Sequence, residues 1–458
     1  MREPLWTADE IAAATGGRAT AAFRATGVSI DSRSVEPGDL FVALAGVRDG
    51  HEFVGGAIQS GAAGALVSRE VDGPAVVVPD TLRALEQLGV AARERSAARR
   101  CAVTGSVGKT SVTQAVMAGL SLAGRAHSSV KSYNNHIGVP LTLARMPKAT
   151  ERAVFEIGMN HAGEIEPLSQ FVRPHAVAIT TVGPVHIENF EDGEEGVARA
   201  KAEVFAGLES GGVAVLNADN KWFELLRIEA ERAGAKVRSF GTGERCHARL
   251  VSFEPPLLKA VIDDKPLEFP LLQSGLHWGL NSLCVLLLLE AMEVEQATAI
   301  EALSNFAPLA GRGAERQVRI KGGAFTLVDE SYNANPISMA AAMKSLGARK
   351  TSGRRIVALT DMLELGPDGP AFHAGLAEPI EAAGVDLVFC AGPQMKSLWE
   401  ALPATRRGAY AGTAAELAPR VVAAAEPGDV VMVKGSNGSR AGAIAAALAA
   451  LDAEGTGG

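Results

Sequence analysis

A glycine-rich turn between a strand-like run and a helix-like run carries the clearest chemical signal in the sequence. It reads Val103-Thr104-Gly105-Ser106-Val107-Gly108-Lys109-Thr110-Ser111. Glycines let the backbone bend so that amides point at phosphate oxygens, and the following helix adds the partial positive charge of its N-terminus. In such a loop the lysine reaches the β- and γ-phosphates and the next hydroxyl ligates Mg²⁺. The segment therefore predicts that residues 105–111 bind ATP or GTP.

The spacing of this loop departs from the usual pattern at one point. GxxxxGK[ST] places its first glycine at position 103, which is Val103 here. The alternative is a tight strand–helix turn with an exposed lysine. The apolar strand before the loop and the amphipathic helix after it favour the phosphate-binding interpretation.

Two more candidate groups follow apolar runs. Glu156 closes the run Ala153–Ile157, and His186 comes after the run Ala176–Val182. In open α/β sheets ligands bind beyond the C-terminal ends of the strands, so both side chains are expected near the phosphate loop. Because Mg²⁺ prefers oxygen ligands, Glu156 is a candidate partner for Thr110.

Three of the candidates are weak evidence for a functional site when residue type alone is considered. A single histidine such as His186 is more often structural or at the surface. Lys201, inside a predicted helix that follows Glu194-Glu195, would alone be read as a solvated lysine. Glu156 alone is equally well explained as an exposed strand-end carboxylate. Only their combination with other motifs favours a functional role.

The elements that must hold these groups alternate between strands and helices, which predicts an α/β fold with mostly parallel sheets. The length of 458 residues suggests about three domains. We expect an N-terminal domain over 1–97, a central nucleotide-binding domain over 98–309 and a C-terminal Rossmann-like domain over 310–458. The last is predicted from four strands separated by helices: Phe325–Asp329, Ile356–Thr360, Leu387–Ala391 and Val430–Lys434. A charged helix is expected over Leu82–Arg100.

Composition excludes several classes of partner. A net charge of −8 and an isoelectric point near 5.7 argue against a nucleic acid or an anionic membrane as the main partner. The four cysteines form no CxxC pair, and acidic residues stand among the first ten where a signal peptide would be apolar. The apolar runs Leu283–Leu289 and Ala441–Leu451 are too short to span a bilayer. A cytoplasmic protein is expected.

These candidates occur in a fixed order with other motifs. The phosphate loop, Glu156 and His186 are accompanied by residues 132–142 (Ser-Tyr-Asn-Asn-His-Ile-Gly-Val-Pro-Leu-Thr) and by Ala200-Lys201-Ala202-Glu203. The set resembles the Mur ligase family. Asp31-Ser32-Arg33 and residues 37–44 are similar to the UDP-sugar-binding domain of that family, so the resemblance runs through all three segments.

Three motifs of the last segment resemble one branch of the family. They are Asp329-Glu330-Ser331-Tyr332-Asn333-Ala334-Asn335-Pro336, residues 361–366 (Asp-Met-Leu-Glu-Leu-Gly) and Lys434-Gly435-Ser436. This branch adds D-alanyl-D-alanine to UDP-N-acetylmuramoyl-tripeptide through an acyl phosphate, which makes the pentapeptide precursor of peptidoglycan. The resemblance thus implies an ATP-dependent, ADP-forming ligase with those two substrates and with Mg²⁺. Three domains closing over one cleft can work as a monomer, which is the expected state.

The resemblance also implies individual roles. Gly105 to Ser111 would hold the ATP phosphates, and Thr110 with Glu156 one Mg²⁺. His186 and Lys201 would hold a second Mg²⁺, the lysine as a carbamate formed with CO₂, which supplies the anionic oxygen that an ammonium cannot. Lys109, His186 and Lys201 are the expected catalytic groups. Further nucleotide contacts are implied for Asn281, Arg312 and Asp329, and substrate contacts for Ser32, Asn134, Asn135, Tyr332 and Asn333.

Other interpretations stay open. Tyr332, Asn333 and Lys434 could equally be a helix cap, a turn and a surface charge. Within the family, the alternatives are the ligase that adds the third residue and a folylpolyglutamate synthetase, both disfavoured by Tyr332-Asn-Ala-Asn-Pro336. Outside it stand a P-loop regulatory or transport NTPase, which would need no UDP-sugar domain, and a non-catalytic nucleotide-binding scaffold.

Overall fold

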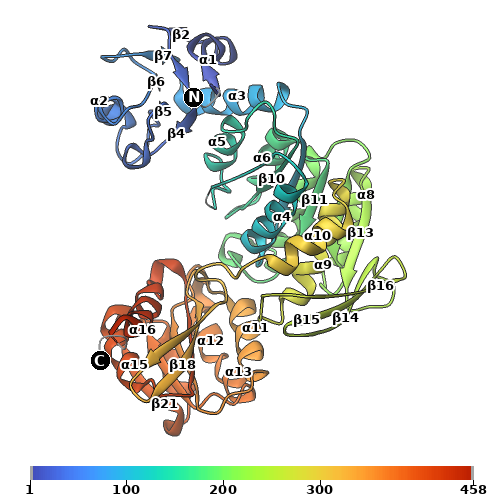
Figure 1. Ribbon diagram of the computed structural model, residues 1–458, viewed down its shortest axis with the longest axis vertical. Helices are drawn as coiled ribbons and strands as arrows, with labels where there is room; N and C mark the ends of the chain where they lie inside the picture. The colour runs from blue at the N-terminus through green and yellow to red at the C-terminus, as the bar shows by residue number, and fades with distance from the viewer. Residues whose placement is uncertain (1–3, 131, 455–458) are drawn as a thin grey trace.

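The computed structural model describes residues 4–130 and 132–454, and it forms three α/β units that each have their own sheet (Figure 1). The units follow one another along an arc, with the central unit between the other two (Figure 1). The expected α/β class with mostly parallel sheets is confirmed. Within the described residues, no helix has both the length and the apolar character needed to cross a membrane.

The N-terminal unit is a five-stranded sheet of order β2-β7-β6-β5-β4, parallel except for the β2–β7 pair. Its strands are β2 (Arg18–Ala19), β4 (Gly27–Ser29), β5 (Asp39–Val42), β6 (Gly64–Val67) and β7 (Ala75–Val77). A separate two-stranded ribbon is made by β1 (Trp6–Thr7) and β3 (Arg24–Ala25). The helices are α1 (Ala8–Thr15), α2 (Val54–Gln59) and α3 (Thr81–Glu94).

Helix α3 is shorter than expected and joins the first two units. The prediction of a helix over Leu82–Arg100 is wrong at its C-terminal end, because α3 stops at Glu94 and residues 99 and 100 begin β8. There the backbone pairs with β10, and the Arg100 guanidinium donates to the carbonyl oxygens of Val172 and Ala98 at 2.8 and 2.7 Å. The pairing with β10 and the bond to Val172 are long-range, and they outweigh the local preference for helix.

The central unit holds a nine-stranded sheet of order β16-β15-β14-β13-β12-β11-β8-β10-β9. The parallel part consists of β8 (Arg99–Thr104), β9 (Ala126–Ser128), β10 (Arg152–Glu156), β11 (Ala176–Ile179), β12 (Val213–Asn217), β13 (Lys236–Gly241) and the start of β14. The helices are α4 (Lys109–Ala123), α5 (Gly138–Ala144), α6 (Ile165–Val172), α7 (Glu194–Ala202), α8 (Phe223–Arg232), α9 (Trp278–Ala291) and α10 (Gln296–Asn305). The apolar run 283–289 lies in α9, and all of its residues are buried.

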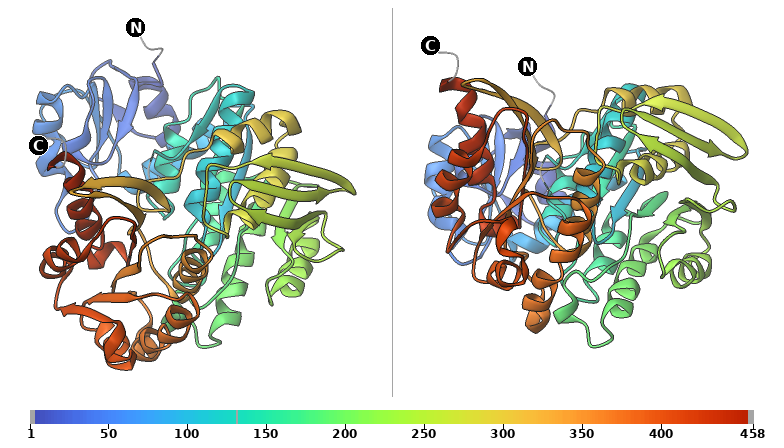
Figure 2. Two further views of the ribbon diagram at one scale, coloured as in Figure 1. Left: turned by 60° about the horizontal axis from the view of Figure 1, so that its bottom comes forward. Right: turned by 90° about the horizontal axis from the view of Figure 1, so that it is seen from below.

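An antiparallel arm at the edge of this sheet was not expected from the sequence. It consists of β14 (Ala248–Glu254), β15 (Leu257–Ile262) and β16 (Lys265–Pro270). Figure 2 shows the arm projecting from the side of the central unit that faces away from the other two units. Asp263 and Asp264 both have positive φ, as a two-residue hairpin turn requires. This Asp-Asp pair between two alternating runs was the available signal.

The C-terminal unit holds a six-stranded sheet of order β17-β18-β22-β19-β20-β21, parallel except for the β17–β18 pair. Its strands are β17 (Ala314–Ile320), β18 (Gly323–Glu330), β19 (Arg355–Thr360), β20 (Leu387–Ala391), β21 (Arg407–Ala411) and β22 (Val430–Lys434). The helices are α11 (Pro336–Gly347), α12 (Gly369–Ala374), α13 (Ala377–Ala382), α14 (Met395–Ala401), α15 (Ala414–Ala424) and α16 (Gly442–Glu454). All four strands predicted here are present.

Candidate active site

The glycine turn after β8 is shaped by its packing against the segment that follows β11. Gly105 and Gly108 have φ values of 143° and 90°, which L side chains rarely adopt. A Cβ on Gly105 would collide with the Thr180 hydroxyl. Ser106 locks the turn, since its amide donates to the Thr181 carbonyl oxygen at 2.7 Å and its hydroxyl donates to the Gly183 carbonyl oxygen at 3.1 Å. The amide of Ser106 thus holds the loop itself, while the first turn of α4 leaves its amides available to an anion.

Lys109 and Thr110 begin α4 at the floor of the site. The Lys109 Nζ donates to the Gly105 carbonyl oxygen at 2.6 Å, so the side chain folds back over the loop. Burial lowers the pKa of Lys109, and the nearby negative charge of Glu156 opposes this shift. The Thr110 hydroxyl lies 3.3 Å from the Ser132 hydroxyl.

Glu156 ends β10 next to the loop, as expected from its place in the sequence. Its side chain is 4 % exposed, and its Oε1 accepts a hydrogen bond from Asn134 Nδ2 at 2.7 Å. Asn134, which was expected to contact the substrate, therefore orients Glu156, which was expected to bind Mg²⁺. Asn135, next to Asn134 in the chain, is exposed. Its Oδ1 accepts hydrogen bonds from the amides of Ile137 and Gly138, and these bonds stabilise the start of α5.

His186 and Lys201 approach the loop from the other side. His186 Nδ1 lies 2.8 Å from Glu364 Oε2 of the C-terminal unit. Burial lowers the pKa of His186; Glu364 opposes the shift, and the charges of Lys109 and Lys201 add to it. Lys201 is 3 % exposed in α7, and its Nζ has no hydrogen-bond or ion-pair partner in the described chain. Burial, and secondly Lys109, lower the pKa of Lys201 well below 10.5.

The C-terminal unit closes the site with the ends of β18 and β22. The Arg312 guanidinium lies 4.0 Å from the centre of the Tyr332 ring, and the Tyr332 hydroxyl donates to the Ser132 hydroxyl at 3.4 Å. Asp329 does not face the site: its carboxylate accepts from the amides of Gly311 and Ser331, which holds the turn that carries Arg312.

Lys434, at the end of β22, is buried on the side of the site formed by the C-terminal unit and is not a surface charge. It is 2 % exposed, and its Nζ donates to the Asn333 carbonyl oxygen at 3.0 Å and lies 3.4 Å from Glu330 Oε2. Asn333 accepts from the amide of Ala334, and the cap of α11 is Asn335. Glu330 was not singled out from the sequence, although it stands at the C-terminal end of β18, the same signal that identified Glu156.

These groups line one cavity of about 550 Å³ between the central and C-terminal units. Of the residues predicted from the sequence, it is lined by Ser106, Val107, Gly108, Lys109, Thr110, Ser111, Asn134, Glu156, His186, Asn281, Arg312, Tyr332 and Asn333. The Asn281 amide oxygen lies beside Gly108, 3.4 Å from where a Cβ would stand. Gly105, Asp329, Asn135 and Lys201 support or adjoin the cavity without lining it. Ser32 lies in the 3-10 turn Ser32–Ser34 of the N-terminal unit, outside the cavity.

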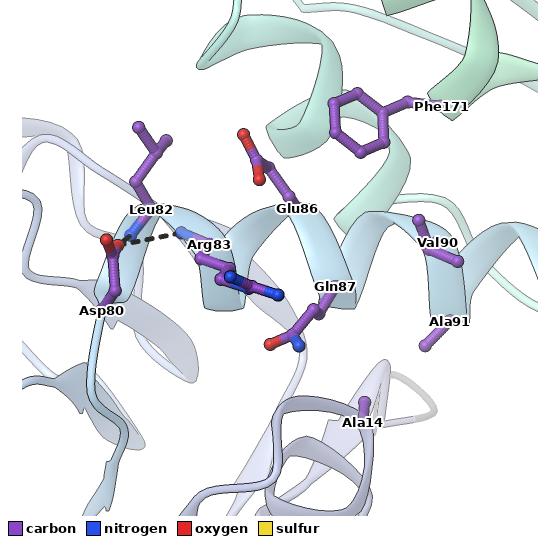
Figure 3. Close-up of a pocket in the computed structure, with 9 residues that line it drawn as sticks. All are labelled: Ala14, Asp80, Leu82, Arg83, Glu86, Gln87, Val90, Ala91 and Phe171. Carbon is purple, nitrogen blue, oxygen red and sulfur yellow. Dashed lines mark hydrogen bonds between the residues drawn. The ribbon is translucent and has the colours of Figure 1, made fainter. Parts of the chain in front are cut away.

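Two other cavities are not lined by the residues that the sequence predicted for the site. One of about 1100 Å³ lies between the N-terminal and central units and is lined by Thr26, Asp39, Arg95, Tyr133 and Arg145 among others. The other is an open depression of about 610 Å³ along α3, bordered by Ala14 of α1 and Phe171 of α6 (Figure 3). Its Asp80 is occupied as the cap of α3, and none of the predicted residues lines it.

A phosphate loop that faces a second, Rossmann-like unit across a shared cavity is typical of a nucleotide-dependent enzyme. Comparison with known sequences narrows this class. Family models match over residues 103–289 (Mur ligase middle domain), 315–437 (Mur ligase, glutamate ligase domain) and 24–118 (Mur ligase family, catalytic domain). The chain belongs to the Mur ligase family.

Individual relatives agree with this assignment. The chain is 34 % identical to the UDP-N-acetylmuramoyl-tripeptide–D-alanyl-D-alanine ligase of Escherichia coli, over 81 % of this chain and 82 % of that protein. A crystal structure of MurF from Acinetobacter baumannii superposes with a TM-score of 0.85 at 28 % identity, covering 98 % and 99 % of the two chains. MurF from Thermotoga maritima in complex with ADP shares the fold, with a TM-score of 0.77 at 22 % identity over 93 % and 98 %.

Proposed function

We propose that this chain joins D-alanyl-D-alanine to UDP-N-acetylmuramoyl-tripeptide at the expense of ATP. The observation that carries the proposal is the single cavity in which the phosphate loop, Glu156 and His186 of the central unit meet Arg312, Tyr332 and Lys434 of the C-terminal unit. The similarity to the E. coli ligase supplies the substrates. Motifs of the same branch, 329–336 and 434–436, border that cavity.

The chemistry explains why two facing units are needed. An amide does not form spontaneously from a carboxylate in water, so the tripeptide carboxylate oxygen takes the γ-phosphoryl group and ADP leaves. The amine of the dipeptide then attacks the acyl carbon, phosphate departs and the amine loses a proton. Lys109 stabilises charge on the transferred phosphoryl oxygens. Closure of the two units over the cavity would limit water, which would hydrolyse the acyl phosphate.

The donor set around the loop fits Mg²⁺. In the described chain, no three His, Cys, Asp or Glu side chains come close enough to hold an ion by themselves. Mg²⁺ does not need such a cage, because it is commonly bound by one or two protein oxygens together with substrate phosphates and water. Thr110 and Glu156, oriented by Asn134, would hold one ion. Bound Mg²⁺ offsets phosphate charge.

A second ion would be held by His186 and by Lys201 as a carbamate. The support is the buried amine of Lys201, which has no partner in the described chain and has a lowered pKa. A neutral amine is the form that reacts with CO₂, and the product supplies an anionic oxygen. His186 supplies a ring nitrogen.

The proposal also assigns a place around the cavity to each of the three substrates. We place the nucleotide between Gly105–Ser111, Asn281 and the Arg312 turn that Asp329 holds. The tripeptide reaches the cavity along the 132–135 segment, whose Asn134 faces it and whose Asn135 shapes it. Its UDP-sugar end lies on the N-terminal unit near Ser32. Tyr332 and Asn333 border the side from which the dipeptide enters.

Three broader properties belong to the same proposal. We place the domain boundaries near residues 97 and 309, because the sheets of the three units lie within 18–77, 99–270 and 314–434. The proposed enzyme works as a monomer in the cytoplasm. Neither a nucleic acid nor a membrane is a partner.

The test is phosphate release from Mg²⁺-ATP with the UDP-linked tripeptide, with and without D-alanyl-D-alanine, and with single D-alanine as the control. Release that requires both substrates, with a pentapeptide product, supports the proposal. Release that is indifferent to the dipeptide, or that responds to a single amino acid instead, would assign the chain to another Mur-type ligase or to a regulatory NTPase.

A further inference from the structure

The contact between His186 and Glu364 bridges two units. His186 follows β11 in the central unit, and Glu364 lies in the loop after β19 in the C-terminal unit. Nδ1 of the imidazole is 2.8 Å from Oε2 of the carboxylate. At this distance the carboxylate charge repels a lone pair on Nδ1 and attracts a proton there, so the contact favours the Nδ1–H tautomer. Nε2, on the opposite side of the ring, is the nitrogen left to receive a proton or a cation, and within the described residues it makes no hydrogen bond.

Both partners have a backbone conformation that is unusual for their residue type. His186 has a φ of 58° and Glu364 a φ of 62°, in the left-handed region that non-glycine residues rarely enter. The Glu364 side chain is 59 % exposed, and an ion pair this exposed adds little stability. The pair alone therefore does not explain why two strained residues meet. Strain of this kind is found at functional sites, where the surroundings fix it.

The surroundings of Glu364 do fix it. On one side, the Leu363 amide donates to the Ser436 hydroxyl at 3.1 Å, and the Met362 amide donates to His373 Nε2 at 3.0 Å. On the other side, Leu365 is 4 % exposed in the core of the C-terminal unit. The loop thus holds the carboxylate outward, toward the central unit.

We infer that Glu364 is a positioning residue that selects the Nδ1–H tautomer of His186 and aims its Nε2 into the cavity. The arrangement matches the carboxylate–histidine pairs that orient metal-bound histidines in other proteins. Since the carboxylate comes from the C-terminal unit, the imidazole is correctly set only when that unit is docked. Metal binding at His186 is thereby coupled to closure of the cavity. This inference rests on the proposed function.

The first test is independent of catalysis and uses full-length, metal-free protein with ¹⁵N-labelled histidine. The His186 signals are identified among the nine histidines by their loss in His186→Asn. Wild type should show the Nδ1–H tautomer at alkaline pH, and Glu364→Ala should show a mixture richer in Nε2–H. Glu364→Gln keeps an accepting oxygen and should retain most of the Nδ1–H form. Glu191→Ala removes an exposed carboxylate of the neighbouring segment and serves as the control.

The second test measures the Mg²⁺ concentration for half-maximal ligation. Loss of such an oriented carboxylate weakens metal affinity or activity about 10–100-fold, so Glu364→Ala should need at least about tenfold more Mg²⁺. Glu364→Gln should lie near wild type, and Glu191→Ala at wild type. An unchanged tautomer and an unchanged Mg²⁺ requirement in Glu364→Ala would overturn the inference while leaving the ligase assignment intact. Failure of the wild type to ligate would instead refute the proposed function.

Discussion

Lys201 carries an amine that the fold keeps from water and from every partner in the described chain. The side chain is 3 % exposed, and its pKa lies well below 10.5, first because of burial and then because of Lys109. A neutral amine attacks CO₂, forms an N–C bond and releases a proton. Under the proposed function, the carbamate would place an anion beside His186, where Lys109 disfavours a cation. Replacing Lys201 by alanine should therefore remove ligase turnover and leave the fold intact.

The size of the effect can be estimated. Removing one preorganised polar group that stabilises developing charge costs about 2.7–4 kcal/mol, or roughly 10²–10³ in kcat. We expect a loss at least this large in Lys201→Ala. Stability changes less, because the buried methylenes of the lysine stem contribute about 0.8 kcal/mol each and the amine opposes folding. A net loss of stability of about 2 kcal/mol or less is expected.

The assay is ligation by Lys201→Ala with added formate or acetate, which can occupy the space of the missing arm and supply the oxygen. Recovery of about tenfold over the unassisted variant is expected. Lys201→Met is the matched control, because its side chain fills that space and should block rescue. Equal concentrations of chloride control for ionic strength.

A pH series on Lys201→Met separates the buried amine from catalysis. In CO₂-free buffer the unfolded lysine titrates near 10.5 and the folded one at lower pH. Between these values the unfolded state binds more protons, so wild-type stability rises with pH. The stability advantage of the methionine variant should be largest below the folded pKa and vanish above 10.5. Wild-type activity in Lys201→Ala, or rescue of Lys201→Met by carboxylates, would refute the reasoning.

Three further outcomes are expected. Lys109→Met should lower kcat about 10²–10³-fold and keep the melting temperature, because the variant lacks the lysine charge that stabilises the transferred phosphoryl oxygens. Near-normal turnover would contradict this role of Lys109. Gly105→Ala should lose about 1–3 kcal/mol and weaken nucleotide binding measured by calorimetry, since φ is 143° and the new Cβ would meet Thr180. Burial lowers the pKa of His127 to about 4, so as pH falls from 6.5 to 4 the unfolded state gains the proton first and stability drops by about 3 kcal/mol. Urea unfolding at both pH values should show this drop, and His127→Gln should reduce it.

The place of the candidate site in the fold could be predicted from the chain. The phosphate loop, and Glu156 after β10, depend on a strand followed directly by glycines or by a polar residue. That pattern acts over a few residues, and the C-terminal ends of parallel strands always meet at one edge of a sheet. The strands of the C-terminal unit were predicted for the same reason. The antiparallel arm over 248–270 was not, because its pairing depends on a hairpin at Asp263-Asp264 that the alternating pattern alone did not identify.

The partners of these groups could be known only from the tertiary structure. That Asn134 bonds Glu156, or that Glu364 reaches His186, depends on how strands register and how whole units dock, across 22 and 178 positions of the chain. No local propensity encodes such a distance. Likewise, Lys201 looks like any solvated helix lysine in the sequence. Its burial is decided by what packs around α7, and that burial lowers the pKa of its amine.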